Sequence, residues 1–388
     1  MLDNRLWRSG RVRLRPSRLP FSSLDGQASY QRPRTAARGI RGDMRVCILG
    51  ATGLVGRELL ELIDRAWPGA TLDLYASRDQ TLEYHDRMMK VEAASKLERD
   101  DVSRPQLAFV ALDDEYSARY VPRLLALGSK VVDKSNAFRM DPKVPLVVAG
   151  VNANRVDDTI DLVANPNCTT IPFALAVAPL SRRWELHSAT VSTYQAISGA
   201  GLATLDEFLR DVSDCYRQPN RLGTHLDVRK YAGNVVPHAA KTDESGFSSE
   251  ERKLVFESRK ILELPQLLIS AQCCRVPVAV GHYENAWVGL GQAANVSDLA
   301  AVLGHPVAAP FVRCLPGPEG EGLTALACVH DRDTALVGRI RRDFRDDSGR
   351  TFCLTIAADN LRLGAATNAV RIASRWFPVH DEALQAPA

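Results

Sequence analysis

The sequence predicts an α/β protein, with a Rossmann-type doubly wound sheet followed by a second, α+β domain. Three observations predict it. A strand, a glycine-rich turn and a helix follow one another from residue 46, further apolar strand-like runs alternate with helical stretches, and residues 169–355 mix strand runs with polar loops but contain no second glycine-rich turn. The chain has 388 residues, 45% apolar and 24% charged, which fits a globular protein of about two domains.

The first predicted strand, residues 46–49, leads without a gap into Gly50-Ala51-Thr52-Gly53-Leu54-Val55-Gly56. Gly50 permits the tight turn, Gly53 permits close backbone approach to a pyrophosphate, and Gly56 permits close packing of the helix on the sheet. Apolar residues then recur on one face of a helix through residue 63. Glycine turns also occur for steric reasons alone, but this position between strand and helix predicts a nucleotide site formed by Gly50, Thr52, Gly53, Leu54, Val55 and Gly56.

Four further strands are predicted at residues 72–76, 107–112, 130–132 and 146–151. The second strand of the sheet ends at Ser77 and Arg78, where an NAD site commonly offers a carboxylate to the ribose. A serine and an arginine suit a 2′-phosphate instead, so these two residues predict NADP. Asp79 opposes that interpretation unless its side chain points away, and a solvated loop is the alternative.

Cys168 lies where an apolar strand, residues 162–164, turns into a helix through Pro166 and the candidate N-cap Asn167. Pro172 is tolerated only in the first helical turn, so the helix should begin at about residue 168 or 169. The positive end of the helix dipole would then lower the pKa of the thiol by about one unit or more, which suits a nucleophile. The alternative is a buried structural cysteine.

Near the C-terminus, residues 359–376 predict a helix that returns to the first domain, with small residues around Gly364 that allow close approach to a backbone or a cofactor. The loop at residues 234–250 is predicted to be a flexible cover. The expected divisions are an extension at 1–43, the NADP-binding domain at 44–167, a catalytic and dimerisation domain at 168–355 and the returning helix and tail at 356–388.

The first 43 residues carry ten arginines, no lysine and three aspartates, a charge of +7 within an overall +3. The rest of the chain is therefore acidic, which gives no reason to expect nucleic-acid binding by the globular part. An organelle transit peptide, a flexible basic arm and a translated leader before Met44 are all compatible with this segment; a disordered or spurious extension is preferred. No apolar run reaches the length of a membrane span, and eight cysteines without paired metal spacing favour a reducing cytoplasm.

Three motifs together carry a resemblance to a known family: Asn165-Pro166-Asn167-Cys168-Thr169-Thr170, Tyr194-Gln195-Ala196-Ile197-Ser198-Gly199-Ala200-Gly201 and Arg275-Val276-Pro277-Val278-Ala279-Val280-Gly281-His282. The chain from Met44 to Phe377 resembles aspartate-β-semialdehyde dehydrogenases. The resemblance implies a homodimer or a dimer of dimers that uses NADPH to reduce aspartyl phosphate to its semialdehyde, releasing inorganic phosphate.

The resemblance also implies a role for each matching residue. Cys168 would be the nucleophile, His282 would shuttle the proton, and Gln195 would orient the substrate or the thioester. Charged side chains would hold the substrate. Arg139 and Lys253 would bind its phosphate, Arg275 would bind its α-carboxylate, and Glu250 would bind its ammonium side. The cofactor would also contact Ser198, Gly199 and Asn368. A fixed arginine fork suits a carboxylate and a compact ammonium suits phosphate, although Glu250 and Lys253 are also spaced for an ordinary surface ion pair on a helix.

One segment departs from the family pattern, because Asp113, Asp114 and Glu115 stand where small residues are expected beside the cofactor. These acids could narrow the adenosine pocket or repel phosphate. Three alternatives stay open: an acyl-phosphate reductase of the N-acetyl-γ-glutamyl-phosphate type, a specialised paralogue of another pathway, and a non-catalytic paralogue. The retained set of Cys168, Gln195, Arg275 and His282 argues against the last of these.

Overall fold

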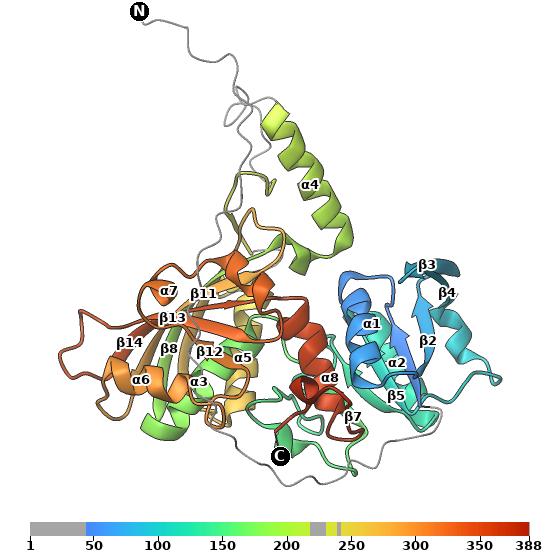
Figure 1. The fold of residues 1–388 in the computed structure, drawn as a ribbon, viewed down its shortest axis with the longest axis horizontal. Helices are drawn as coiled ribbons and strands as arrows, with labels where there is room; N and C mark the ends of the chain where they lie inside the picture. Colours follow the sequence, from blue (N-terminus) through green and yellow to red (C-terminus); the bar gives the residue numbers. More distant parts are fainter. Residues whose placement is uncertain (1–43, 218–229, 239–241, 388) are drawn as a thin grey trace, which may run out of the picture. The chain divides into compact units, whose positions relative to one another are not determined.

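The chain is described by a computed structural model that covers residues 44–217, 230–238 and 242–387 (Figure 1). The predictions for residues 1–43, and part of those for the 234–250 loop, lie outside this range. Among the residues covered, no helix combines the length and apolarity that crossing a membrane requires.

The first sheet confirms the doubly wound prediction. Its seven strands have the order β3-β4-β2-β1-β5-β6-β7, and all neighbours run parallel except β3 and β4. The strands are β1 (Arg45–Leu49), β2 (Thr71–Ala76), β3 (Gln80–Tyr84), β4 (Arg87–Ala93), β5 (Leu107–Val110), β6 (Lys130–Asp133) and β7 (Leu162–Ala164). Helices α1 (Leu54–Ala66) and α2 (Asp114–Ala126) connect strands of this sheet. The strand order reverses at β1, which places a ligand crevice at the carboxyl ends of β1 and β5.

One prediction for this region is corrected, and one pair of strands was not predicted. Residues 146–151 form only an isolated bridge, between Leu146 and Ala164, instead of a strand. The side chain of Asn152 accepts from Val148 N and donates to Leu146 O, which bends the segment into a turn. The hairpin of β3 and β4 was not predicted, and its turn carries His85 and Asp86 with positive φ of 46° and 58° rather than glycine.

The second sheet has the order β12-β13-β14-β11-β8-β10-β9 and is mixed, which confirms the α+β prediction. Its strands are β8 (Leu186–Gln195), β9 (Val236–Pro237), β10 (Leu268–Arg275), β11 (His282–Leu290), β12 (Val312–Cys314), β13 (Ala335–Arg342) and β14 (Thr351–Ala358). Helices α3 (Thr170–Trp184), α5 (Ser249–Leu262) and α6 (Val296–Leu303) pack on this sheet and share one apolar core with it. Almost every residue of α3 is buried, so this helix, which begins directly after Cys168, is held in the core.

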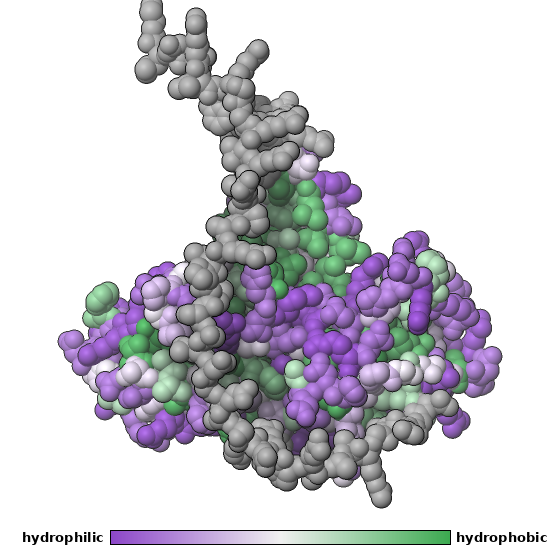
Figure 2. All heavy atoms as spheres, in the orientation of Figure 1, coloured by the Kyte–Doolittle hydropathy of each residue, from purple (hydrophilic) through white to green (hydrophobic). Residues whose placement is uncertain are grey.

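Short helices occupy connections between strands: η1 (Ala94–Glu98), η2 (Ala153–Arg155), η3 (Ile197–Ala200), α7 (Gly317–Glu321) and η5 (Ala325–His330). Another, η7 (Glu382–Leu384), lies in the C-terminal segment. Helix α4 (Leu202–Arg217) follows η3. Its Leu202 and Leu209 are 40% and 49% exposed, and Figure 2 shows apolar side chains gathered in this region of the surface.

The predicted C-terminal helix is present in two parts, a π-helical segment η6 (Arg362–Thr367) and the α-helix α8 (Asn368–Ala373). Side chains of both parts, including Ala366 and Val370, share an apolar cluster with α1 and β1. The π-helical segment places Gly364 against Cys168, where an added Cβ would lie 3.0 Å from the Cys168 carbonyl oxygen. The C-terminal segment therefore touches both the glycine-turn helix and the candidate nucleophile.

Candidate active site

The glycine-rich turn has the geometry that a dinucleotide requires. Gly50 adopts a φ of +89°, and a Cβ on Gly56 would lie 2.2 Å from the Gly50 carbonyl oxygen, so glycine is needed at both positions. Gly53 is the N-cap of α1. The first backbone N–H groups of that helix lack intrahelical acceptors and face an anion naturally. The turn therefore fits the pyrophosphate of a nicotinamide cofactor.

Cys168 lies in the turn between β7 and α3. Helix α3 begins at Thr170 with Thr169 as its N-cap, slightly later than predicted. The Asn167 side chain accepts from Thr169 N at 3.0 Å and from Thr169 Oγ1 at 2.6 Å, so it fixes the turn without being the N-cap. The Cys168 thiol therefore lies directly before the start of a buried helix, in a turn that hydrogen bonds fix.

Cys168 and His282 form a close pair, because Cys168 Sγ lies 3.2 Å from His282 Nε2. On the other side of the ring, His282 Nδ1 accepts from Ala196 N at 3.1 Å. A neutral imidazole carries one proton, so an accepting Nδ1 leaves that proton on Nε2, directed at the sulfur. His282 is therefore held as a hydrogen-bond donor to Cys168.

The expectation that the pKa of Cys168 is lowered is wrong for the free protein. Burial, with the Glu250 carboxylate as the second cause, raises the pKa of Cys168 to about 11, and Arg275 and Lys134 oppose this only in part. Burial and Arg275 lower the pKa of His282 to about 3. The resting pair is therefore a neutral thiol beside a neutral imidazole. The helix start is visible in the local sequence, whereas the burial and Glu250 come from distant segments.

Three predicted residues stand in one row across the second sheet. Arg275 pairs with Gln195 on the neighbouring strand, and Gln195 faces His282 across β8 and β11, next to the pair Tyr283 and Tyr194. All three side chains are buried. The next row inward holds Cys273, Thr193 and Glu284, in the register of the same strands.

Arg275 and Gln195, which are neighbours in this row, have different positions relative to the cavity. Arg275 Nη1 donates to Ala196 O at 2.7 Å, and a Cβ on Gly199 would lie 2.6 Å from Nη1, so glycine leaves room for the guanidinium. Gln195 Nε2 donates to Thr193 Oγ1 at 3.2 Å, which turns the amide inward, beneath the cavity. Arg275 reaches the cavity, whereas Gln195 does not line it.

Helix α5 supplies two buried carboxylates to the turn before the nucleophile. Glu250 Oε1 accepts from Asn167 Nδ2 at 2.9 Å, and Glu257 Oε2 accepts from Asn167 N at 2.7 Å. Burial opposes ionisation of Glu250, but Lys253, His238 and the Asn167 side chain outweigh it and lower its pKa to about 2. A charged carboxylate thus lies close to the reactive sulfur. Glu257 was not singled out in the sequence, since nothing local marks it.

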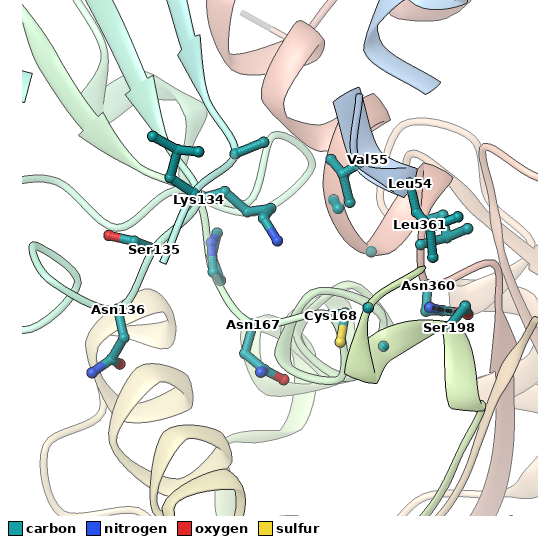
Figure 3. Close-up of a pocket in the computed structure, with 18 of the residues that line it drawn as sticks. Leu54, Val55, Lys134, Ser135, Asn136, Asn167, Cys168, Ser198, Asn360 and Leu361 are labelled. Atoms are coloured by element: carbon teal, nitrogen blue, oxygen red, sulfur yellow. Dashed lines mark hydrogen bonds between the residues drawn. The ribbon is translucent and has the colours of Figure 1, made fainter. Parts of the chain in front are cut away.

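Ser198 joins the site to the C-terminal segment. Asn360 Nδ2 donates to Ser198 Oγ at 2.9 Å, the bond drawn in Figure 3, and Asn360 Oδ1 accepts from Gly281 N at 3.0 Å. Gly281 has a φ of +101° and precedes His282. Asn360 is a site residue that the sequence analysis missed, because no motif surrounds it.

One cavity of about 460 Å³ brings most of these groups together. Figure 3 shows Leu54 and Val55 bordering the same space as Lys134, Cys168 and Ser198. Of the predicted site residues, the cavity is lined by Gly53, Leu54, Val55, Gly56, Arg139, Cys168, Ser198, Gly199, Glu250, Lys253 and Arg275. The arrangement places a thiol, a nucleotide turn and charges of both signs in one space.

Comparisons with known proteins agree with this geometry. The family described as semialdehyde dehydrogenase, NAD binding domain, matches residues 45–159, and the one described as semialdehyde dehydrogenase, dimerisation domain, matches residues 177–363. The aspartate-semialdehyde dehydrogenase of Aquifex aeolicus is 33% identical over 85% of this chain and 96% of its own length. The chain belongs to the aspartate-semialdehyde dehydrogenase family.

Two further relatives extend this result. The Corynebacterium glutamicum aspartate-semialdehyde dehydrogenase is 34% identical over 84% of this chain and 98% of its own length. A crystal structure of aspartate semialdehyde dehydrogenase II from Vibrio cholerae, complexed with ASA, has a TM-score of 0.76 at 29% identity and covers 86% of this chain and 98% of that one. These relatives support the aspartate-semialdehyde dehydrogenase family over the N-acetyl-γ-glutamyl-phosphate reductase alternative.

Several of the predicted site residues lie outside the cavity. Asn368 is buried and donates Nδ2 to Val147 O at 2.9 Å and to Asn165 Oδ1 at 2.8 Å. Both of its amide hydrogens are therefore used within the protein. Ser77 and Arg78 are exposed at the end of β2, and Gly50, Thr52 and His282 also lie beyond the cavity lining.

The acids that depart from the family pattern are held at the start of α2. Asp113 is its N-cap, and Asp114 and Glu115 stand in its first turn, where negative charge is favourable. Asp114 Oδ1 accepts from Asn136 N at 2.7 Å and is the only one of the three acids that lines the cavity. The acids therefore have a structural role at this helix.

Proposed function

We propose that this chain catalyses the reversible reductive dephosphorylation of L-4-aspartyl phosphate to L-aspartate 4-semialdehyde, with NADPH as the reductant. The observation that carries the proposal is the close approach of Cys168 Sγ to His282 Nε2, at 3.2 Å, where Cys168 lines the same cavity as residues of the nucleotide turn. A thiol in this position can form the covalent acyl intermediate that the reaction needs.

In the proposed mechanism, the Cys168 sulfur attacks the acyl carbon of the substrate, and the thiol proton leaves with the phosphate. The new C–S bond replaces the C–O bond to phosphate, which leaves as inorganic phosphate. A nicotinamide cofactor, which the turn of Gly53 and Gly56 would hold, would supply the hydride that reduces the thioester. The C–S bond then breaks to give the aldehyde and the thiolate. The Nε2–H of His282 is directed to stabilise the thiolate and the developing oxyanion by hydrogen bonding.

This role for His282 differs from the proton shuttle that the sequence suggested. To accept the thiol proton at Nε2, the ring would first have to lose its own proton there, or Nδ1 would have to release Ala196 N. His282 therefore acts as a hydrogen-bond donor to the sulfur and not as the acceptor of its proton. Gln195 lies between Arg275 and His282 in the same row of the sheet, so its role is to position these two residues.

The charge of Glu250 supports a substrate with a free ammonium group. This carboxylate is buried, and its pKa of about 2 keeps it charged at neutral pH. An N-acetylated amine carries no charge and would leave Glu250 without its cationic partner on the substrate. Arg275 suits the α-carboxylate, and Arg139 and Lys253 line the side of the cavity proposed for phosphate.

NADP specificity is supported by the end of β2. Asp79 Oδ1 accepts from Ala93 N at 2.8 Å and pairs with Lys96 at 2.8 Å, so its charge is balanced there. Ser77 and Arg78 remain exposed and suited to a 2′-phosphate. The match to a dimerisation domain, together with the exposed Leu202 and Leu209 of α4, supports a homodimer. The cytoplasmic location and the choice between a housekeeping and a specialised pathway stay predictions.

The test is phosphate-dependent reduction of NADP with L-aspartate semialdehyde, compared with N-acetyl-L-glutamate semialdehyde. We expect turnover with the first substrate alone, and none with Cys168→Ser, whose folding is checked by thermal unfolding. Turnover by a verified Cys168→Ser protein would exclude the covalent mechanism. A preference for the N-acetylated substrate would exclude the role of Glu250.

A further inference from the structure

The cations around the cavity differ in whether their charge is already balanced. Arg139 Nη1 forms a buried ion pair with Glu257 at 2.9 Å, and its Nη2 and Nε donate to the carbonyl oxygens of Lys134 and Asn165. Lys253 Nζ lies 3.3 Å from Glu250 Oε2. The two residues expected to hold phosphate are therefore both paired with a carboxylate of α5.

Lys and Arg side chains at four positions line the cavity, and Lys134 differs from the other three: Arg139 and Lys253 are paired with carboxylates, and Arg275 donates to Ala196 O. Lys134 follows β6 directly, and its backbone N–H continues the sheet by donating to Val110 O at 2.9 Å. Its side chain is half-buried and lines the cavity, yet its amine forms no hydrogen bond or ion pair with any described residue. Figure 3 shows Lys134 extending into the space that Val55 and Cys168 also border.

A cation in such a position is costly without a partner. Burial and the nearby Arg139 lower the pKa of Lys134, because both disfavour the ammonium form. An anion bound in the cavity would reverse this effect and restore the charge. The carboxyl end of β6 also lies next to β5, beside the crevice where ligands of this fold bind.

We propose that the Lys134 ammonium binds a phosphoryl group in this cavity. The inference rests on the proposed function, and the phosphoryl group has two sources there. One is the substrate phosphate, which leaves as inorganic phosphate near Cys168; the other is the cofactor pyrophosphate at the start of α1. Lysine suits both, as a compact charge with three donors.

The experiment compares Lys134→Met, which keeps the length of the side chain but removes its charge, with Lys134→Arg. Lys143→Met, at an exposed lysine of the same segment, is the matched control. Three quantities are measured: the KM for inorganic phosphate during NADP reduction, the concentration of phosphate that protects Cys168 from alkylation, and the Kd of NADPH from fluorescence titration without substrate.

We expect Lys134→Met to weaken binding of either inorganic phosphate or NADPH by about ten- to a hundredfold, which is the effect of losing a charged hydrogen bond. Lys134→Arg keeps the charge and should weaken the same binding much less. A rise in the phosphate KM and protection constant identifies the substrate phosphate. A rise only in the NADPH Kd identifies the cofactor. All three values within twofold of the unmodified protein would overturn the inference.

A measurement on the unmodified protein covers the case in which Lys134→Met does not fold. Acetylation of lysines by an activated ester is followed by mass spectrometry, and phosphate or NADPH should slow labelling of Lys134 but not of Lys143. Equal labelling with and without both ligands would contradict the inference. If the unmodified protein lacks phosphate-dependent turnover, the proposed function fails, and the binding and labelling measurements still decide the role of Lys134.

Discussion

The free protein should have a thiol at Cys168 that reacts slowly at neutral pH, contrary to what its helix-start position suggests. With a pKa of about 11, roughly 0.1% of the thiol is ionised at pH 8, against roughly a quarter for an unperturbed thiol of pKa about 8.5. Since the thiolate is the reactive form, we expect alkylation by iodoacetamide to be roughly two hundredfold slower than that of an unperturbed thiol.

The assay follows carboxamidomethylation of the Cys168 peptide by mass spectrometry, which separates it from the other cysteines. Because the raised pKa keeps the thiol protonated below it, the rate should rise about tenfold per pH unit from pH 7 to pH 10 without a plateau. A plateau below pH 9 would show that the thiolate already forms in the free protein, and the reasoning from burial and Glu250 would be refuted.

Glu250→Gln tests the cause of the raised pKa. It removes the carboxylate charge that, after burial, is the main cause of the raised pKa of Cys168. The amide oxygen of glutamine can still accept from Asn167 Nδ2. The curve of alkylation rate against pH should therefore move to lower pH. Glu263→Gln, at an exposed glutamate that ends the same helix, is the control and should leave the profile unchanged. A substrate ammonium bound at Glu250 would have the same effect, so binding and activation of the thiol would be coupled.

Four other substitutions test separate parts of the site. Arg78→Ala should reduce the preference for NADP over NAD by about ten- to a hundredfold in affinity, measured by titration with each cofactor; equal affinities in the unmodified protein would contradict the assignment. His282→Asn should lower the single-turnover rate by roughly a hundredfold or more, whereas Arg275→Lys should mainly raise the KM for the semialdehyde, since it keeps the charge but loses the fork; an unchanged chemical rate for His282→Asn would remove this residue from the mechanism. Gly364→Ala should lower turnover without loss of cofactor binding, because its Cβ would lie 3.0 Å from the Cys168 carbonyl oxygen and displace the nucleophile; full activity would show that the π-helical segment yields instead.

The sequence predicted those parts of the site whose physics is local. The glycine turn could be recognised because Gly50 and Gly56 stand where positive φ and close packing exclude other residues. The start of α3 was placed within about two residues by its proline. By contrast, the apolar run at 146–151 resembles a strand, and the hydrogen bonds that make it a buried turn come from Asn152, directly after it, and from the distant Asn368.

Properties that depend on strand pairing could not be predicted in the same way. The row of Arg275, Gln195 and His282 exists because β8 lies between β10 and β11, an order that no local pattern encodes. The same holds for the charge state of Cys168, which depends on Glu250 eighty-two residues later in the chain. Lys134 was not predicted as a site residue because it differs from Arg139 and Lys253 only in lacking a carboxylate partner among the described residues. Those ion pairs join residues that the sequence does not show to be in contact.

The row of Arg275, Gln195 and His282 has a consequence for how this chain can vary. Side chains alternate between the two faces of a sheet, so deletion of one residue within β11 would replace His282 by a neighbour and turn the imidazole to the opposite face. A substitution changes one position of this row, whereas a single-residue insertion or deletion in one of the three strands shifts every later residue of that strand relative to its neighbours. Length changes should therefore accumulate in the connections between strands, and a library of codon deletions scored by complementation should show β8, β10 and β11 as its most depleted segments.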